Sequence, residues 1–173
     1  DGFQPATAAC PTPCRLTCSG TSQMCVPLPP NTLYVSPTGT ADGLSPCNPT
    51  SISGLNGATG TLSGWTIRFA AGSYSTPIVL THSRFAGITI QGGYTSDFRA
   101  RPGALRTAPM PNRTRLIVDA THAVTVGQTM TISGLDIGTT NASAPGAYRA
   151  TVFVNAGTLT LTESSLVAGN GVG

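Results

Sequence analysis

Residues 124–141 (VTVGQTMTISGLDIGTTN) and residues 152–170 (VFVNAGTLTLTESSLVAGN) are two versions of one pattern, and this repeat decides the fold. Apolar residues recur at an offset of 28 or 29 residues, and threonines recur between them. Within each copy, apolar and polar residues alternate, which is the period of two that a β-strand requires. The matched residues are Val124 and Val152, Val126 and Val154, Met130 and Leu159, Ile132 and Leu161, Ile137 and Leu166, and Asn141 and Asn170.

A period near 29 residues that holds three short strands and no helix predicts one coil of a β-solenoid. Each coil leaves its apolar side bare until the next coil stacks on it, at a spacing of about 4.8 Å, with strands in parallel. We therefore expect an all-β fold with a parallel β-helix over residues 65–167. We also expect Asn141 and Asn170 to meet at one corner as a short amide ladder. The residues expected inside are Val126, Ile132, Ile137, Val154, Leu161 and Leu166.

An earlier coil is visible at residues 88–93 (ITIQGG), which match residues 130–135 (MTISGL) at an offset of 42. About 13 extra residues must therefore intervene, and we place them in the polar run 95–113, as a loop that leaves the solenoid. Strand patterns begin upstream at residues 33–35, and a short helical turn is expected near residues 52–55.

Composition sets the broad class. A chain of 173 residues favours one main domain, and 39% apolar residues in strand-like runs argue against disorder. Charged residues are only 9%, the net charge is +3, and every basic residue is Arg. Basic residues are too sparse for a nucleic-acid binder. No apolar run approaches the 18 residues that a membrane-spanning helix needs.

Four cysteines, Cys10, Cys14, Cys18 and Cys25, lie close together among prolines and glycines. Such a segment buries little apolar area, so we expect two disulfides among them, with the pairing open. A zinc site is the alternative, although paired C-x2-C spacing and nearby histidines are missing from the sequence.

Cys47 is the odd cysteine: it can be buried and free, bridge to another chain, pair with a cysteine upstream of this sequence, or replace one of the four. Disulfides imply an oxidising compartment, so we expect a protein that is secreted or on the outer cell surface. The expected organisation is a disulfide-bonded cap or linker at residues 1–31 and a β-helix at residues 32–173.

Several stretches resemble the right-handed parallel β-helix proteins of the pectate-lyase-like superfamily, in their secreted or surface bacterial form. They are the entry strand at residues 33–39 (LYVSPTG), the turn at 67–74 (IRFAAGSY), the corner at 88–94 (ITIQGGY) and the coil end at 168–171 (AGNG). The resemblance covers roughly residues 32–173 and implies a right-handed β-helix. It implies no activity, because lyases of this superfamily use carboxylate clusters for calcium and a basic proton acceptor, and this chain has only six acidic residues.

Asp119 and Asp136 are the one plausible carboxylate pair for catalysis, with His122 and Arg115 nearby in sequence. If they met in a groove, they could act as acid, base and oxyanion clamp. The alternative is that each Asp forms a turn. Calcium at either Asp is a weaker interpretation, since calcium takes six or more oxygens. We expect no cofactor and no metal.

The strongest functional feature is a run of arginines that places five of nine within seventeen residues, around Phe98. They are Arg99, Arg101, Arg106, Arg113 and Arg115. Guanidinium groups bind carboxylate and phosphate in bidentate fashion, so this loop predicts binding to acidic polysaccharide or lipopolysaccharide. The alternative is a solvated loop whose Arg stems cover the flank of the solenoid.

The sequence therefore favours a non-enzymatic extracellular or cell-surface module, structural, adhesive or glycan-binding. The second candidate is a carbohydrate-active β-helix enzyme, a lyase or hydrolase, which a cleft holding Asp119 or Asp136 beside Arg115 would favour. The coil at residues 151–171 is as apolar as the one before it. We expect its outer end to meet another surface, through further coils or end-to-end self-association.

Overall fold

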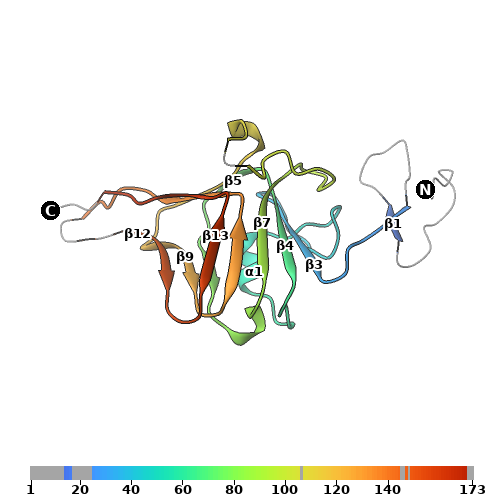
Figure 1. The fold of residues 1–173 in the computed structure, drawn as a ribbon, viewed down its shortest axis with the longest axis horizontal. Helices are drawn as coiled ribbons and strands as arrows, with labels where there is room; N and C mark the ends of the chain where they lie inside the picture. Colours follow the sequence, from blue (N-terminus) through green and yellow to red (C-terminus); the bar gives the residue numbers. More distant parts are fainter. Residues whose placement is uncertain (1–13, 17–24, 106, 145–146, 148, 171–173) are drawn as a thin grey trace.

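The computed structural model describes residues 14–16, 25–105, 107–144, 147 and 149–170. The fold is nearly all-β, and its body consists of three sheets in which neighbouring strands run parallel (Figure 1). Sheet I contains, in spatial order, β13 (Leu159–Thr162), β10 (Met130–Ser133), β7 (Thr89–Tyr94), β4 (Thr66–Ala70) and β3 (Thr32–Val35). Sheet II contains β14 (Ser165–Val167), β11 (Leu135–Thr139), β8 (Thr114–Val118) and β5 (Gly72–Tyr74). Sheet III contains β12 (Ala150–Val154), β9 (His122–Val126) and β6 (Ile78–Leu80).

The chain visits the three sheets in rotation. Strands β4, β5 and β6 belong to sheets I, II and III, and the next two sets of three strands repeat that order. We call each such set a coil. Each strand therefore pairs with its counterpart one coil away, an arrangement compatible with a β-solenoid.

The sequence repeat is confirmed by the strand register. Val124 pairs with Val152, and Ile132 pairs with Leu161, both in parallel. The earlier offset of 42 is confirmed as well, because Thr131 pairs with Thr89. Residues 95–113 therefore form an excursion between β7 and β8, whose described residues include a short 3-10 turn, η2 (Met110–Asn112).

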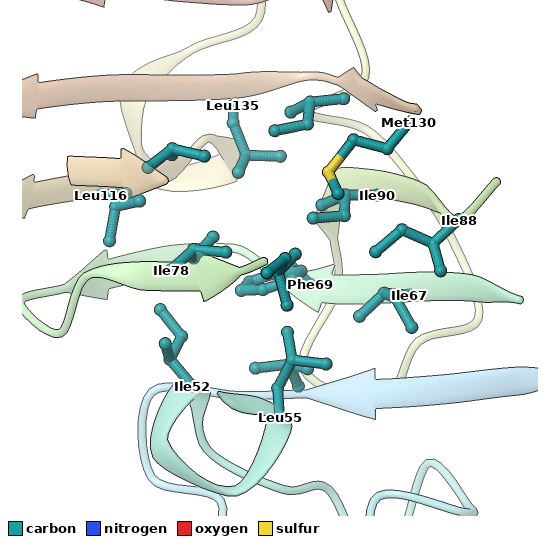
Figure 2. Packing of buried hydrophobic residues seen from close by; sticks show 14 of the residues in the cluster. Ile52, Leu55, Ile67, Phe69, Ile78, Ile88, Ile90, Leu116, Met130 and Leu135 are labelled. Atoms are coloured by element: carbon teal, nitrogen blue, oxygen red, sulfur yellow. The ribbon is translucent and has the colours of Figure 1, made fainter. Parts of the chain in front are cut away.

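The core is built from ladders of aliphatic residues that stack from strand to strand (Figure 2). In sheet I the ladder joins Leu33, Ile67, Ile90, Ile132 and Leu161. Ile67, Ile90 and Ile132 are fully buried. Burial of each such side chain stabilises the fold by about 1.5–3 kcal/mol.

The predicted interior is correct for Val126, Ile132 and Ile137, which are buried. Leu161 is half-buried and packs against the core. The prediction is wrong for Val154, which is 43% exposed, and for Leu166, which is 48% exposed. The reason is position: β12, β13 and β14 each end the spatial order of their sheet. Among the described residues, no further strand lies on them.

The opposite end of the stack is covered by the helix α1 (Ile52–Asn56), near the predicted helical turn. Ser51 caps it by accepting a hydrogen bond from the Gly54 backbone N–H, and Ile52 and Leu55 point into the core (Figure 2). The Asn56 side chain then closes the open edge of β6. Its Nδ2 donates to the Pro77 carbonyl at 2.9 Å, and its Oδ1 accepts from the Val79 N–H at 3.0 Å.

Other local elements are short. A 3-10 turn, η1 (Ser83–Phe85), leads into the coil that contains β7, and β1 (Cys14–Leu16) pairs antiparallel with β2 (Cys25–Pro27). The side chains of the four early cysteines lie outside the described residues, so their expected pairing stays a prediction. Cys47 is disulfide-bonded and is therefore not a free thiol.

Candidate functional site

The excursion at residues 95–113 does not extend into solvent as a simple loop. It folds back on the sheets through a close approach of two glycines: the Gly103 N–H donates to the Gly93 carbonyl at 3.0 Å. A Cβ on Gly93 would collide with the Gly103 backbone, and its φ of 83° also favours glycine. The excursion is therefore held against the sheets at this point.

Arg113 is not an exposed loop residue, contrary to our expectation. Its side chain is 1% exposed, and all five of its N–H donors are used. Nε and one Nη bond the two carboxylate oxygens of Asp136 at 3.1 and 2.6 Å. The other donors bond the carbonyls of Gly103, Leu105 and Glu163. Arg113 thus connects the excursion to sheet II, and no donor remains for a ligand.

The remaining arginines of the predicted cluster are dispersed. Arg99 is exposed and lies 3.6 Å from Asp97, and Arg106 lies outside the described residues. Arg115 is exposed on the outer face of sheet II. Arg101 reaches sheet I, where Nε donates to the Gly92 carbonyl at 2.8 Å. These arginines therefore do not form one binding loop.

Sheet I carries the most unusual polar cluster, on its outer face. Arg68 of β4 lies in register between Tyr34 of β3 and Gln91 of β7. The central carbon of its guanidinium group lies 6.0 Å from the Tyr34 ring centroid and 5.0 Å from that of Tyr94. Cation–π contacts of this kind favour a desolvated guanidinium over an aromatic face.

Arg101 adds a second cation to the same cluster. Its guanidinium carbon lies 5.7 Å from the Tyr94 ring centroid, and its Nη2 donates to the Ser133 carbonyl and hydroxyl oxygens, both at 3.0 Å. Burial lowers the pKa of Arg101; Tyr94 opposes this shift, and the nearby charge of Arg68 adds to it. We call Arg68, Arg101, Tyr34, Tyr94 and Gln91 the sheet I cluster.

The excursion also packs an aromatic ring beneath this cluster. Phe98, buried and held at a φ of 59°, meets Tyr34 edge-on at 5.1 Å between ring centroids. Tyr34 is buried, and this burial raises the pKa of its hydroxyl. The aromatic layer is therefore a support for the two arginines, and its rings are not available to stack on a ligand.

A groove of about 610 Å³ lies on the outer face of sheet II. It contains Asp136 beside Arg115, the feature that we expected of a carbohydrate-active enzyme, and aliphatic side chains line the rest. Asp136, however, accepts hydrogen bonds from Arg113 and Ser165, which lower the pKa of its carboxyl. A carboxylate so engaged is a poor proton donor at neutral pH.

The other two catalytic candidates lie apart from this groove. Asp119 bonds Arg149 at 2.6 Å and accepts a hydrogen bond from the Thr140 hydroxyl at 3.0 Å, which lowers the pKa of its carboxyl. His122 stacks on Phe153, with 4.8 Å between ring centroids. Neither residue lines the groove. The predicted constellation of Asp119, Asp136 and His122 is therefore not assembled.

In the described part of the chain, no group of three or more His, Cys, Asp or Glu side chains is arranged to hold a metal ion. Likewise, none of the helices there has the length and apolarity to cross a membrane.

The fold places this chain in a structural class: an all-β protein with three parallel sheets. Comparison with known proteins goes no further, because no family model, no curated protein and no solved structure matches it.

Proposed function

We propose that this protein is a non-enzymatic extracellular or cell-surface module that binds acidic glycans, on a right-handed parallel β-helix. This proposal rests on several guanidinium groups that have no carboxylate partner. Among the described side chains, ion pairs engage Arg99, Arg113 and Arg149, but not Arg68, Arg84, Arg101 or Arg115. Charge of this kind on outward sheet faces attracts anionic polymers.

Two general arguments support the rest of this proposal. Parallel strands joined by a crossover are right-handed in about 98% of cases, which favours the right-handed form for a chain that visits its sheets in rotation. The cysteine-rich start of the chain, together with the disulfide at Cys47, favours an oxidising compartment and hence export.

A charged-glycan array tests the function. We expect binding to acidic polysaccharide, or to the phosphate groups of lipopolysaccharide, but not to neutral polysaccharides of equal length. Binding should weaken as salt rises, because the contacts are electrostatic. Equal binding to neutral and acidic glycans, or none to either, would overturn the proposal.

The enzymatic alternative rests on one observation, the groove that contains Asp136 beside Arg115. Incubation with acidic polysaccharides, followed by assays for new reducing ends and for unsaturated sugars, separates the two functions. A binding module leaves the polymer intact, whereas a hydrolase or a lyase shortens it.

Self-association is a second role that the open end of the stack supports. Four exposed apolar side chains gather on β12 and β14: Phe153, Val154, Leu166 and Val167. We propose that a second copy of the chain covers this end. Exposed apolar patches rimmed by polar residues are typical of protein interfaces.

A further inference from the structure

Arg68 differs from Arg113 in one decisive respect. Arg113 uses every N–H donor on protein acceptors, as described above. Arg68 is half-buried, and none of its guanidinium donors has a hydrogen-bond acceptor among the described residues. Its Nε is buried without any partner. A buried polar group without a partner destabilises the folded protein, and more so when the group is charged.

The aromatic contacts position the Arg68 guanidinium but do not provide acceptors for its N–H donors. Its central carbon lies within 6.0 Å of the Tyr34 ring centroid and 5.0 Å of that of Tyr94, so the two rings position the group. The guanidinium is therefore a planar fork of N–H donors that still lacks a protein acceptor among the described residues. A carboxylate matches this fork with two parallel hydrogen bonds.

Two neighbours favour an anion at the same place. Arg101 is held near Tyr94 by its bonds to Gly92 and Ser133, so two like charges share one ring without a carboxylate. Gln91 Oε1 accepts a hydrogen bond from the Tyr94 hydroxyl at 2.7 Å. The amide N–H donors of Gln91 are therefore directed away from the tyrosine. An anion would relieve the repulsion and accept these donors.

We propose that Arg68 and Arg101, with Gln91 beside them, form a subsite for the carboxylate of an acidic sugar. This inference rests on the proposed glycan-binding function and assigns its anchoring contact. Arg68 supplies the bidentate contact, Arg101 supplies the second charge, and the tyrosines position the fork.

The test compares a uronic acid tetrasaccharide with its carboxyl-reduced, neutral counterpart, by isothermal titration calorimetry. Arg68→Gln should weaken binding of the acidic ligand at least tenfold, the order expected when a charge-assisted bidentate contact is lost. Arg68→Lys should weaken it less, because it keeps the charge and loses the fork. Arg149→Gln is the control, since it removes the same charge at a guanidinium that already pairs with Asp119, outside the sheet I cluster.

The outcomes separate the subsite from the function as a whole. If Arg68→Gln binds the acidic tetrasaccharide as tightly as the unmodified protein, the subsite is wrong while glycan binding stands. If the unmodified protein binds no acidic glycan, the proposed function itself fails. A sulfated tetrasaccharide that outcompetes the uronic acid would show that the subsite prefers sulfate and would overturn the carboxylate assignment. Arg101→Gln repeats the test if Arg68→Gln does not fold.

Discussion

Arg113 and Asp136 form a buried, bidentate ion pair that joins the excursion to sheet II, with N···O distances of 3.1 and 2.6 Å. Asp136 lies on β11, opposite Ser165 of β14, and its Oδ1 also accepts a hydrogen bond from the Ser165 hydroxyl at 2.6 Å, so its carboxylate joins the excursion to two neighbouring strands. Arg113, which we expected to bind ligands, and Asp136, which we expected to transfer protons, are thus bonded to each other.

Arg113→Ala should therefore destabilise the fold by about 3–5 kcal/mol, because it leaves the Asp136 charge and several carbonyls without their partner. Chemical denaturation measures the change. Arg99→Ala is the control: its ion pair is exposed, and such pairs contribute about 0–1 kcal/mol. Equal losses for the two variants would contradict the structural role of Arg113.

Acid should weaken the same contact. The folded state lowers the pKa of Asp136, so its contribution to stability is complete above the unfolded pKa of about 3.9. That contribution is lost as the pH falls through the lower, folded value. We expect Asp136→Asn to be less stable than the unmodified protein at pH 7, and the difference to shrink below about pH 4. A difference that does not change with pH would refute this.

Sequence reasoning predicted the stacking but not these partners. The offset between residues 124–141 and 152–170 fixes which side chains stack, because alternation and coil length are both local properties. Arg113 and Asp136 are 23 residues apart, and only the fold of the excursion brings them together. Arg68 was missed because an outward arginine on an alternating strand is ordinary. The two tyrosines that contact it, Tyr34 and Tyr94, lie on two other strands.

Periodicity also predicts on which face of a strand a side chain lies, but it does not predict whether another strand buries that face. Leu166 stacks on the buried Ile137 as expected, yet it is exposed at the end of sheet II. The asparagine corner shows a similar limit. Asn141 and Asn170 do meet, but through the Asn170 backbone N–H, which donates to Asn141 Oδ1 at 2.9 Å. The expected bond between two side-chain amides was therefore wrong.

The Asn56 side chain takes the place of a neighbouring strand at the edge of β6, because it bonds backbone groups there. Asn56→Ala removes two hydrogen bonds, each with a net contribution of about 0.5–1.5 kcal/mol, and water can reach the exposed Val79 N–H, so we expect a loss of about 1–2 kcal/mol. Amide hydrogen exchange at Val79 should accelerate by more than exchange at Val124, in the neighbouring strand. Unchanged protection at Val79 would show that the cap is dispensable.

Cys47 should appear in a cross-linked peptide when the protein is digested without reduction, since it is disulfide-bonded. The other four cysteines all lie at residues 10–25, so we expect the linked peptide to come from that segment. Mass spectrometry before and after reduction identifies it. A free thiol at Cys47 in the protein as isolated would contradict the structure and weaken the argument for export.

Self-association should occur at the end formed by β12, β13 and β14, and it should stop at the dimer. In the described part of the chain, α1 and Asn56 close the other end, which disfavours head-to-tail stacking into fibres. Two copies that meet through the same end form a closed, two-fold assembly. Leu166→Lys and Val167→Lys place charges in that interface and should shift sedimentation from dimer to monomer. Val79→Lys, on β6 at the opposite end of sheet III, is the control and should leave the dimer intact. An unmodified protein that sediments as a monomer at every concentration would contradict the proposed assembly.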